Sequence, residues 1–597
     1  MKTVALGVGV VLTIAGLGYA YDELTRLSGK AALGAGDVVA IVAIAALVFS
    51  GTALIAQLPD SLRARFRRLP VVIRRRPVYG FGTMLAVGVG ATLGSPLFIL
   101  IPLNVEQYEV VSLLSLLLAT LLSVGMAKVY ADMYRESREL GLESVGGPSF
   151  TKLAWGSRSA RYFISRLSMW VANTALAAYT KIVFLVFDFD FMPPILRTAG
   201  VSPTIATGAT YVIAGLFIAW TLINVLFEQR YLRALGVIQI VLTAVLLLLL
   251  SYHAAVLGSE SGWDLSGLLN FSGGGDWVPA LVVNTGYLYL LFFGFQEIQA
   301  LERDAVGRSS VPIVSWIKRG FTLEKTTYLG VAMVLSVVVA SAFNILYGLA
   351  VFASRPSLTA LQGSQIPALY LAQNVLGPGQ ELLVGVAFLI ATVTTFVPAF
   401  LAAARHLSAL GEDGYMPASI ANLSWVFTLL AIFLLAIANR DFLVNITDFM
   451  VLVSLGMITI SGMWLRQRAG AGGVGRRGLA LVVGAGCFLF GGAVYFIDPT
   501  VVVFGSVAVI FAYLVFDIIE LGNLGAQLFL SVFGLVCIAA LGLFRHTIYL
   551  RGVVLSATQL FGPDPNALLY WGLLAASVLL IANVLLDVKV LERTSMT

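Results

Sequence analysis

The stretch GVGATLGSP, residues 88–96, decides the fold, because it interrupts an apolar run that is otherwise long enough to cross a lipid bilayer. Pro96 has no backbone N–H to give to a helix, and Gly94 is a poor helix former. The sequence therefore predicts a helix broken around Thr92–Pro96, inside the run 80–103. A proline kink packed against a neighbouring helix is the alternative for this one segment.

The composition around this run indicates a membrane protein. Hydrophobic residues make up 59% of the 597 residues and charged residues only 11%, whereas a soluble domain carries about 25% charged residues. The net charge of +6 comes from basic residues in short loops, which excludes a nucleic-acid-binding face. The two cysteines, Cys487 and Cys537, lie in apolar segments and predict neither a disulfide framework nor a metal site.

Apolar runs of bilayer length recur along the chain, about sixteen by the length of a membrane-spanning helix. Unpaired backbone groups are not tolerated in lipid, so these runs are expected to be helices of an all-α integral membrane protein. We divide the chain into two additional N-terminal helices with a basic loop (1–78), a transport core (79–465) and about four C-terminal helices (466–597). The core splits into a first repeat, 79–258, and a second repeat, 279–465.

Basic residues in the loops predict the orientation. The strongest cluster lies in the loop 58–78 and consists of Arg63, Arg65, Arg67, Arg68, Arg74, Arg75 and Arg76. The loop 252–278, on the opposite side, has no Lys or Arg. We expect a multi-pass protein of a prokaryotic plasma membrane with both termini in the cytoplasm. The first run could instead be a cleaved signal ending at Ala20, which leaves the orientation of the rest unchanged.

A second run, 279–300, also carries polar groups at membrane depth. It contains Gly294, Gln296 and Glu297 in an otherwise apolar stretch. A carboxylate in the hydrocarbon core is costly, so Glu297 is expected to have a partner or a function. Alternatively, the helix unwinds near Gly294 and Glu297 meets the cytoplasmic water layer.

The two interrupted runs are the first and the sixth of ten spans between residues 80 and 464. Two five-helix halves that each open with a broken helix are typical of inverted-repeat secondary transporters. We find no metalloprotease, nucleophile-elbow or Walker motif, so neither an enzyme nor a nucleotide-driven pump is predicted. A receptor-like or structural subunit remains the other class, and it predicts an intact first core helix.

Four motifs in this order resemble the amino acid–polyamine–organocation (APC) superfamily of secondary transporters, over roughly residues 78–520. GATLGSPLF (90–98) is similar to that family's G-x-I-I-G-S-G-I-F, and GGPSF (146–150) resembles its cytoplasmic glycine pair. FFGF (292–295), with Pro312 after it, resembles the sixth core helix. The stretch from Thr394 to Arg405, followed by GEDGYMP (411–417), resembles the eighth core helix and is the most specific of the four.

The resemblance implies a five-plus-five (LeuT-like) fold, alternating access and an amino acid or related amine held between the two breaks. In the family, amides of the first break hold a carboxylate and carbonyls of the sixth helix hold an amine. Carried over to this chain, the substrate-binding residues would be Thr92, Gly94, Ser95, Pro96, Phe292, Phe295, Gln296 and Glu297. Pro96 and Glu297 depart from the family pattern, since a glycine and a small residue are usual at these two positions.

The resemblance also bears on the coupling ion, the one cofactor that we expect. Proton-driven members place a lysine on the fifth core helix, where this chain has Leu246. Sodium-coupled members carry a small residue and two hydroxyls on the eighth helix, and oxygen ligands suit a hard cation. The sodium site implied here consists of Gly90, Ala91, Ala391, Thr394 and Thr395. Alternatively, the two threonine hydroxyls bond back to the preceding helical turn, and coupling is to protons or absent.

SPLF (95–98) also resembles the S-P-L-Y of potassium-uptake transporters in the same superfamily, so an inorganic cation is the alternative cargo, with Glu297 as its acidic ligand. Asp448 lies near the predicted outer end of its span, where an interfacial carboxylate is expected and an outer gate is the alternative. The expected partners are the small solute and membrane lipid. The helices outside the core could brace the core or form a homo-oligomer.

Overall fold

The computed structural model describes most of the predicted core and little outside it. The described residues are 9–16, 77–139, 146–157, 159–226, 228–269, 277–311, 321–354, 361, 364–376, 379–415, 421–435, 440–468, 474–498, 501, 502, 505, 508, 509, 512 and 516. The predictions for the arginine cluster, the spans 37–57, 524–544 and 567–588, Cys537, Pro312 and Pro417 lie outside them. The chain divides into two compact units, Ala64–Val501 and Met1–Arg63 with Val502–Thr597, and the account below concerns the first.

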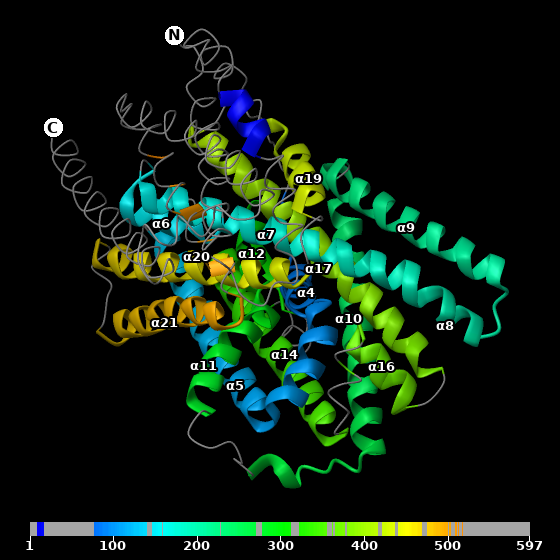
Figure 1. Cartoon of the computed structure of the whole chain (residues 1–597). Helices are drawn as coiled ribbons and strands as arrows, with labels where there is room; N and C mark the ends of the chain where they lie inside the picture. The colour runs from blue at the N-terminus through cyan, green and yellow to red at the C-terminus, as the bar shows by residue number, and fades with distance from the viewer. Residues whose placement is uncertain are drawn as a thin grey trace, which may run out of the picture. The chain divides into compact units, whose positions relative to one another are not determined.

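This unit is mostly helical (Figure 1). Eight of its described helical segments are long and apolar enough to cross a membrane. They are Pro96–Glu139, Ala160–Thr198, Pro203–Asn224, Ala234–Glu260, Trp277–Ala300, Lys325–Ser354, Gln380–Glu412 and Arg440–Met463. Three shorter apolar helices, Phe81–Thr92, Ser424–Phe433 and Gly478–Ala493, add to them.

The helices outside the two breaks follow the order predicted from the apolar runs. They are α6 (Pro148–Trp155), α7 (Ala160–Val186), η1 (Phe187–Phe191), α8 (Met192–Thr198), α9 (Pro203–Leu226), α10 (Glu228–Glu260), η2 (Ser266–Leu269), α14 (Lys325–Ser354), α16 (Pro367–Asn374), α17 (Gln380–Glu412), α19 (Ser424–Leu435), α20 (Arg440–Arg468), α21 (Val474–Ala493) and η5 (Val494–Phe496).

The predicted break in the first core span is present. Helix α4 (Phe81–Thr92) ends at Thr92, and α5 (Pro96–Glu139) begins at Pro96. Proline suits the first position of a helix, because its fixed φ is already helical and its missing N–H has no helical partner there. Helix α5 then turns at Glu109, a non-helical residue with φ 46° and ψ −122°, and continues as the second core span.

The sixth core span is broken as well. Helix α11 (Trp277–Leu288) passes into a 3₁₀ turn, η3 (Tyr289–Phe292), and the chain is then non-helical until α12 (Glu297–Ala300). Gly294 has φ 154°, which a residue with a side chain rarely adopts. The span ends in a second 3₁₀ turn, η4 (Glu302–Asp304).

A short hairpin after this span reaches back to the start of the first one. Strands β1 (Arg308–Ser310) and β2 (Thr322–Glu324) pair antiparallel within the loop that the sequence places on the cytoplasmic side. The hydroxyl of Ser309 accepts a 2.9 Å hydrogen bond from the N–H of Phe81, the first residue of α4. The amides of Val78 and Tyr79 donate to the carbonyl of Asp304 at 2.7 and 2.8 Å. The entry of the first span and the exit of the sixth are therefore joined.

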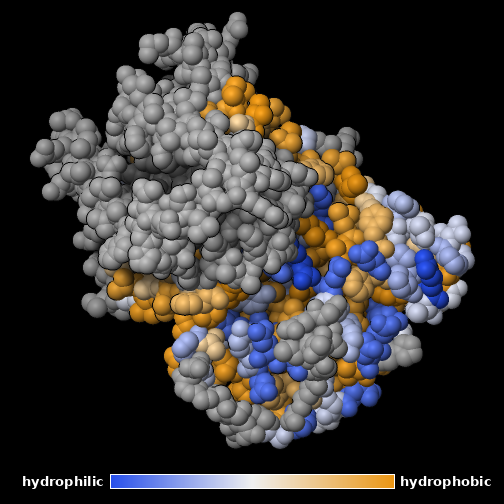
Figure 2. All heavy atoms as spheres, viewed as in Figure 1, coloured by the Kyte–Doolittle hydropathy of each residue, from blue (hydrophilic) through white to orange (hydrophobic). Residues whose placement is uncertain are grey.

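The other core helices pack around the two breaks. Helix α14 packs along α5 and α4, α17 and α20 pack against α7, and α21 lies beside α20 (Figure 1). Large apolar side chains remain on the outer face, which Figure 2 shows in orange over wide areas. They include Ile205, Val212, Leu216 and Leu248 on α9 and α10. Such an outer face suits a lipid solvent.

Candidate functional site

The two breaks touch each other at Gly294 and Thr92. A Cβ atom built on Gly294 would lie 2.5 Å from the backbone nitrogen of Thr92 and 2.7 Å from the carbonyl carbon of Ala91. No real side chain tolerates such distances to backbone atoms, so only glycine allows the two segments to approach this closely. The structure therefore brings together two segments that the sequence separates by about two hundred residues.

All thirteen predicted site residues are buried. From the first span they are Gly90, Ala91, Thr92, Gly94, Ser95 and Pro96, from the sixth Phe292, Phe295, Gln296 and Glu297, and from α17 Ala391, Thr394 and Thr395. They come from three helices that pack against one another. Burial at this depth puts their polar groups out of reach of bulk water.

The first break presents hydrogen-bond donors without acceptors. Among the described residues, the N–H groups of Gly94 and Ser95 have no acceptor, and the Ser95 hydroxyl has no partner either. The next amides are used locally, since Leu97 N–H donates to the Gly94 carbonyl at 3.2 Å. Free donors at the N-terminus of a long helix are suited to an anionic group, because the helix dipole adds to them. Pro96 contributes no donor to this set.

Polar groups of the second break are partly used within the break. The Gln296 side-chain carbonyl accepts from the N–H of Gly294 at 3.1 Å, and its amide faces Glu297 Oε1 at 3.4 Å. The other oxygen of Glu297 has no partner among the described residues. The helix unwinds at Gly294, but Glu297 is only 3% exposed. The alternative in which this carboxylate meets the water layer is therefore wrong for this conformation.

Phe295 of the second break is packed against another aromatic side chain. The Phe295 ring makes an edge-to-face contact with Tyr130, with 5.5 Å between ring centroids. Tyr130 makes a second such contact with Phe150, in the first turn of α6. This geometry is the favoured one for aromatic pairs. Phe295 is therefore held by packing, and Tyr130 is a neighbour that sequence motifs did not identify.

The implied sodium-site residues also converge. The Thr395 hydroxyl donates to the Gly90 carbonyl at 3.2 Å, which links α17 to α4. Thr394 instead bonds back to the carbonyls of Ile390 and Ala391, at 2.9 and 3.2 Å, as in the alternative raised from the sequence. One hydroxyl therefore reaches across to the break, and the other stays on its own helix.

The fifth core helix, α10, contacts the first break at Gly90 through Gln239 and Thr243. Atoms nearest to a Cβ built on Gly90 include Gln239 Nε2, at 2.7 Å, and Thr243 Oγ1, at 3.0 Å. The Thr243 hydroxyl donates to the Ala86 carbonyl at 3.1 Å, while Gln239 Nε2 has no partner. Leu246, the position aligned with the lysine of proton-driven members, lies on the same face of α10, one turn beyond Thr243 and two turns beyond Gln239.

Ion pairs close the end of the bundle that the sequence places in the cytoplasm. Arg405 Nη2 lies 2.7 Å from Asp304 Oδ2, and its Nη1 donates to the Ala300 carbonyl at 3.1 Å. Glu302 is paired with Arg138 and lies 3.4 Å from Lys325 Nζ. Ends of the second, sixth, seventh and eighth core spans are thus tied together. The arginine of the APC-like motif on the eighth helix is one of these ties.

Two further polar residues lie beside the broken sixth helix, and the sequence did not assign either of them to it. Asn344 on α14 donates to the carbonyl of Leu291 at 3.3 Å. Asp448 on α20 is only 1% exposed, so the expectation of an interfacial carboxylate is wrong. The sequence does show that both are polar residues within apolar spans. Their spacing alone does not reveal which neighbouring helix each of them faces.

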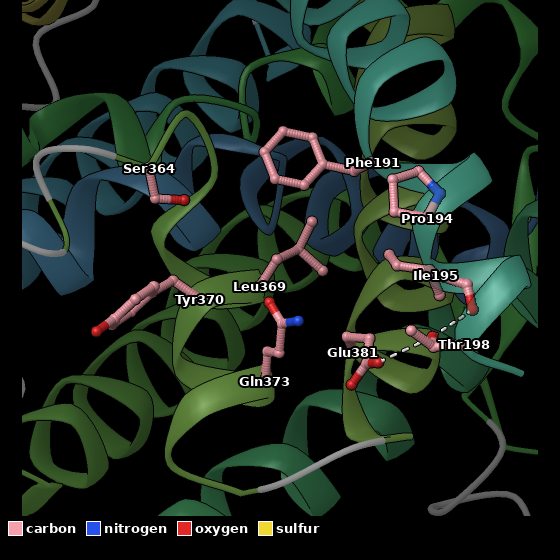
Figure 3. A pocket seen from close by; sticks show the side chains of 9 residues that line it. All are labelled: Phe191, Pro194, Ile195, Thr198, Ser364, Leu369, Tyr370, Gln373 and Glu381. Atoms are coloured by element: carbon pink, nitrogen blue, oxygen red, sulfur yellow. Dashed lines mark hydrogen bonds between the residues drawn. The ribbon is translucent and has the colours of Figure 1, made fainter.

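A separate small cavity of about 140 Å³ lies away from these breaks (Figure 3). Its lining comes from η1, α8, α16 and α17, together with Ser364, and includes none of the predicted site residues. The buried Glu381 carboxylate is already bonded there, to the Thr198 hydroxyl at 3.3 Å and to the Gly379 amide at 3.0 Å. These bonds stabilise the start of α17.

Comparisons with known proteins give only remote matches. No family model and no curated protein sequence matches the chain. Among solved structures, a mutant of the Eremococcus coleocola manganese transporter is 13% identical, with a TM-score of 0.44 over 78% of this chain and 95% of that one. The same transporter with an aromatic bis-isothiourea compound is 12% identical, with a TM-score of 0.43 over 77% and 94%. A substrate-bound Na⁺-coupled sialic acid symporter is 11% identical, with a TM-score of 0.40 over 77% and 96%.

Proposed function

We propose that this chain is a secondary transporter that moves a small solute by alternating access, with the solute held between the two broken helices. The observation that carries the proposal is the contact of the two breaks at Gly294 and Thr92, deep among apolar helices. Irregular backbone at membrane depth occurs where it lines a binding site or a cavity. A structural subunit has no need of two such interruptions.

The proposed fold of the core is the five-plus-five inverted repeat. The two broken spans are the first and the sixth of the ten predicted core spans, as this arrangement requires. The ties between Asp304 and the amides of Val78 and Tyr79 join the inner halves of these two spans. Those inner halves are the parts that move together when such a transporter opens inward.

The proposed solute is an amino acid or a related amine. Its carboxylate would bind the free amides of Gly94 and Ser95, where the dipole of α5 favours negative charge. Its ammonium group would face backbone carbonyls of the second break and the unpartnered oxygen of Glu297. A solute with both charges would satisfy polar groups that are otherwise buried without partners.

Sodium is the proposed coupling ion, held beside the first break. The Gly90 carbonyl and the Thr395 hydroxyl lie together there, 3.2 Å apart, and the Ala391 carbonyl is one turn away from Thr395 on α17. Sodium prefers such hard oxygen ligands. Gln239 Nε2 also lies at Gly90 without a partner, and rotation of this amide presents its oxygen in place of its nitrogen. The ligand set then carries no formal charge beyond that of the ion.

The test is uptake into proteoliposomes that contain the purified full-length protein. An amino-acid and amine panel would be scanned with and without a sodium gradient, beside potassium and divalent cations. Accumulation of one amine-bearing solute, driven by sodium, is the expected result. If no panel member accumulates, binds or raises thermal stability, the transporter proposal loses its basis.

An inorganic cation is the second proposed cargo, because Glu297 is buried at the break with one free oxygen. Glu297→Gln separates the two cargoes. The substitution keeps the size of the side chain and removes its charge. Cation uptake should be lost in this variant, whereas amino-acid uptake that depends mainly on backbone groups should fall only in affinity.

A further inference from the structure

Asp448 is a buried carboxylate that the proposed transport site does not use. It lies eight residues after Arg440, the first residue of α20, which places it about 12 Å along the helix. Among the described residues, neither of its oxygens has a hydrogen-bond partner, and no lysine or arginine forms an ion pair with it. Arg440 is engaged elsewhere, with Asp441 and with the Gln365 carbonyl. A charged carboxylate left in this state is strongly disfavoured.

The surroundings of Asp448 contain other polar atoms without partners. Asn445 precedes it by three residues, on the same face of α20, and its side-chain oxygen is unpartnered. The hydroxyl of Tyr289, at the start of the 3₁₀ turn η3, is fully buried and also unpartnered. An acceptor oxygen one turn away is what a protonated carboxyl group needs as its hydrogen-bond partner.

The same carboxyl group faces the broken sixth helix. Helix α20 packs against η3, and the backbone amide of Leu290 is the backbone group that interacts with Asp448 electrostatically, without forming a hydrogen bond to it. From the opposite side, Asn344 donates to the carbonyl of the next residue, Leu291. The turn that interrupts the helix therefore lies between a fixed amide on α14 and an ionisable group on α20.

We propose that Asp448 binds a proton and that its protonation controls the conformation of the 3₁₀ turn Tyr289–Phe292. With a proton bound, the carboxyl group can donate to Asn445 and remain buried beside η3. Without it, the carboxylate requires donors, and the nearest backbone donor is the amide of Leu290. Recruitment of this amide would rearrange the turn. The inference rests on the proposed function, because it treats the broken helix as the part that holds the solute.

Few charged groups compete with Asp448 for this role. The titratable groups that interact electrostatically with Asp448 are Tyr287 on α11 and Tyr289 on η3. Around these two tyrosines are Tyr179 on α7, Cys487 on α21, and Arg440 and Asp441 at the start of α20, and Asp498 after η5 accepts a hydrogen bond from Asn445. The α5 side contributes Ser123, which does not titrate. The contact of α6 with α20 includes the Trp155–Ser461 bond, more than three turns away along α20.

The first test reads the proton itself and does not need a transported solute. Infrared difference spectra of the full-length protein in nanodiscs, recorded between acidic and alkaline pH, should contain a protonated-carboxyl band that Asp448→Asn removes. Asp441→Asn is the matched control, because Asp441 is on the same helix but its side chain is 64% exposed. Asn445→Leu should shift the band without removing it, since it takes away the acceptor. A protonated-carboxyl region that is identical in wild type and Asp448→Asn overturns the proposal, and Glu297→Gln identifies any band that belongs to the other buried carboxyl group. The proposal also fails if the Asp448 band disappears when sodium is added at constant pH.

The second test reads coupling. Solute affinity of the wild type should change with pH by up to about tenfold per pH unit where Asp448 titrates, whereas Asp448→Asn, which mimics the protonated state, should be nearly independent of pH. If the solute panel gives no binding to any variant, the transport proposal fails while the infrared result still decides the proton site. If wild type and Asp448→Asn bind a solute with the same pH dependence, the coupling role is wrong.

Discussion

Arg405 and Asp304 form an ion pair of 2.7 Å between the end of the eighth core helix and the end of the sixth, and the Asp304 carboxylate is fully buried. Both residues have additional contacts, since Arg405 donates to the Ala300 carbonyl and the Asp304 carbonyl accepts from the start of the first span. Asp304 therefore ties the eighth core helix to the sixth through its carboxylate, and the sixth to the first through its backbone carbonyl.

Loss of one partner of this pair should be costly. Arg405→Ala should destabilise the protein by about 3–5 kcal/mol, because it leaves a buried carboxylate without its main counter-charge. The double variant Arg405→Gln/Asp304→Asn should recover part of that loss. Arg308→Ala is the control, because Arg308 and Glu324 form an exposed pair worth less than about 1 kcal/mol. Thermal unfolding in detergent measures all three, and equal effects at both pairs would contradict the expectation.

A side chain at Gly294 should separate the two breaks. Gly294→Ala places a Cβ 2.5 Å from a backbone atom and at an unfavourable φ, so it should cost at least about 1–3 kcal/mol. If the two breaks form the solute site, affinity should fall about tenfold or more, since 1.4 kcal/mol corresponds to a factor of ten. Gly215→Ala, on α9, is the matched control, because its Cβ would meet nothing within 4 Å. Unchanged solute binding in Gly294→Ala would place the site elsewhere.

Sodium coupling should depend on Thr395 and not on its neighbour in the same helix. Thr395→Val replaces the hydroxyl that reaches the Gly90 carbonyl and should weaken apparent sodium affinity about tenfold, since one lost polar ligand costs about 1–3 kcal/mol. Thr392→Val removes an equally buried hydroxyl that bonds only to the Phe388 carbonyl of its own helix. Sodium dependence of uptake, or of thermal stability, distinguishes them. Equal losses in both variants would point to packing as the cause.

The broken sixth helix should depend on Asn344. Asn344→Leu keeps the volume but leaves the Leu291 carbonyl without this donor, at a cost of about 1–3 kcal/mol. We expect lower thermal stability and weaker solute binding together. Ser341→Ala, one turn away on the same helix, removes a hydroxyl that bonds only to Val337 and should leave solute binding unchanged. If Asn344→Leu and Ser341→Ala bind the solute with the same affinity, Asn344 does not contribute to the solute site.

Interruptions of the helices were the part of the site that the sequence predicted well. Glycine and proline act locally on backbone conformation, so the break at Thr92–Pro96 and the unwinding at Gly294 follow from the residues themselves. The meeting of Thr395 with Gly90 also agrees with the order of the motifs.

Which residues of a helix contact its neighbours could not be predicted in the same way, because it depends on tertiary packing. Gln239 and Leu246 lie on one face of α10, two turns apart, and only packing against α4 decides which turn of that face meets Gly90. Asp448 was placed at the interface because it is near the end of an apolar run, but neighbouring helices bury it. Asn344 belongs to none of the motifs found in the sequence. The hairpin between Arg308 and Glu324 lies in a loop whose pairing depends on contact with the start of α4.

Glu109, the non-helical residue within α5, makes the two halves of the first span differ in how freely each can move relative to the other helices. Beyond the break, the helical residues Pro96–Tyr108 are joined to the second span by Glu109 alone, so there is no longer linker that could absorb a rotation. Any tilt of this half must therefore rotate the whole of Val110–Glu139, and α14, which packs along it, must follow. Before the break, α4 is held at its start by the Asp304 and Ser309 hydrogen bonds. If the transport proposal holds, the half beyond the break would move together with the second span and α14, whereas movement of α4 would first break the hydrogen bonds at its start.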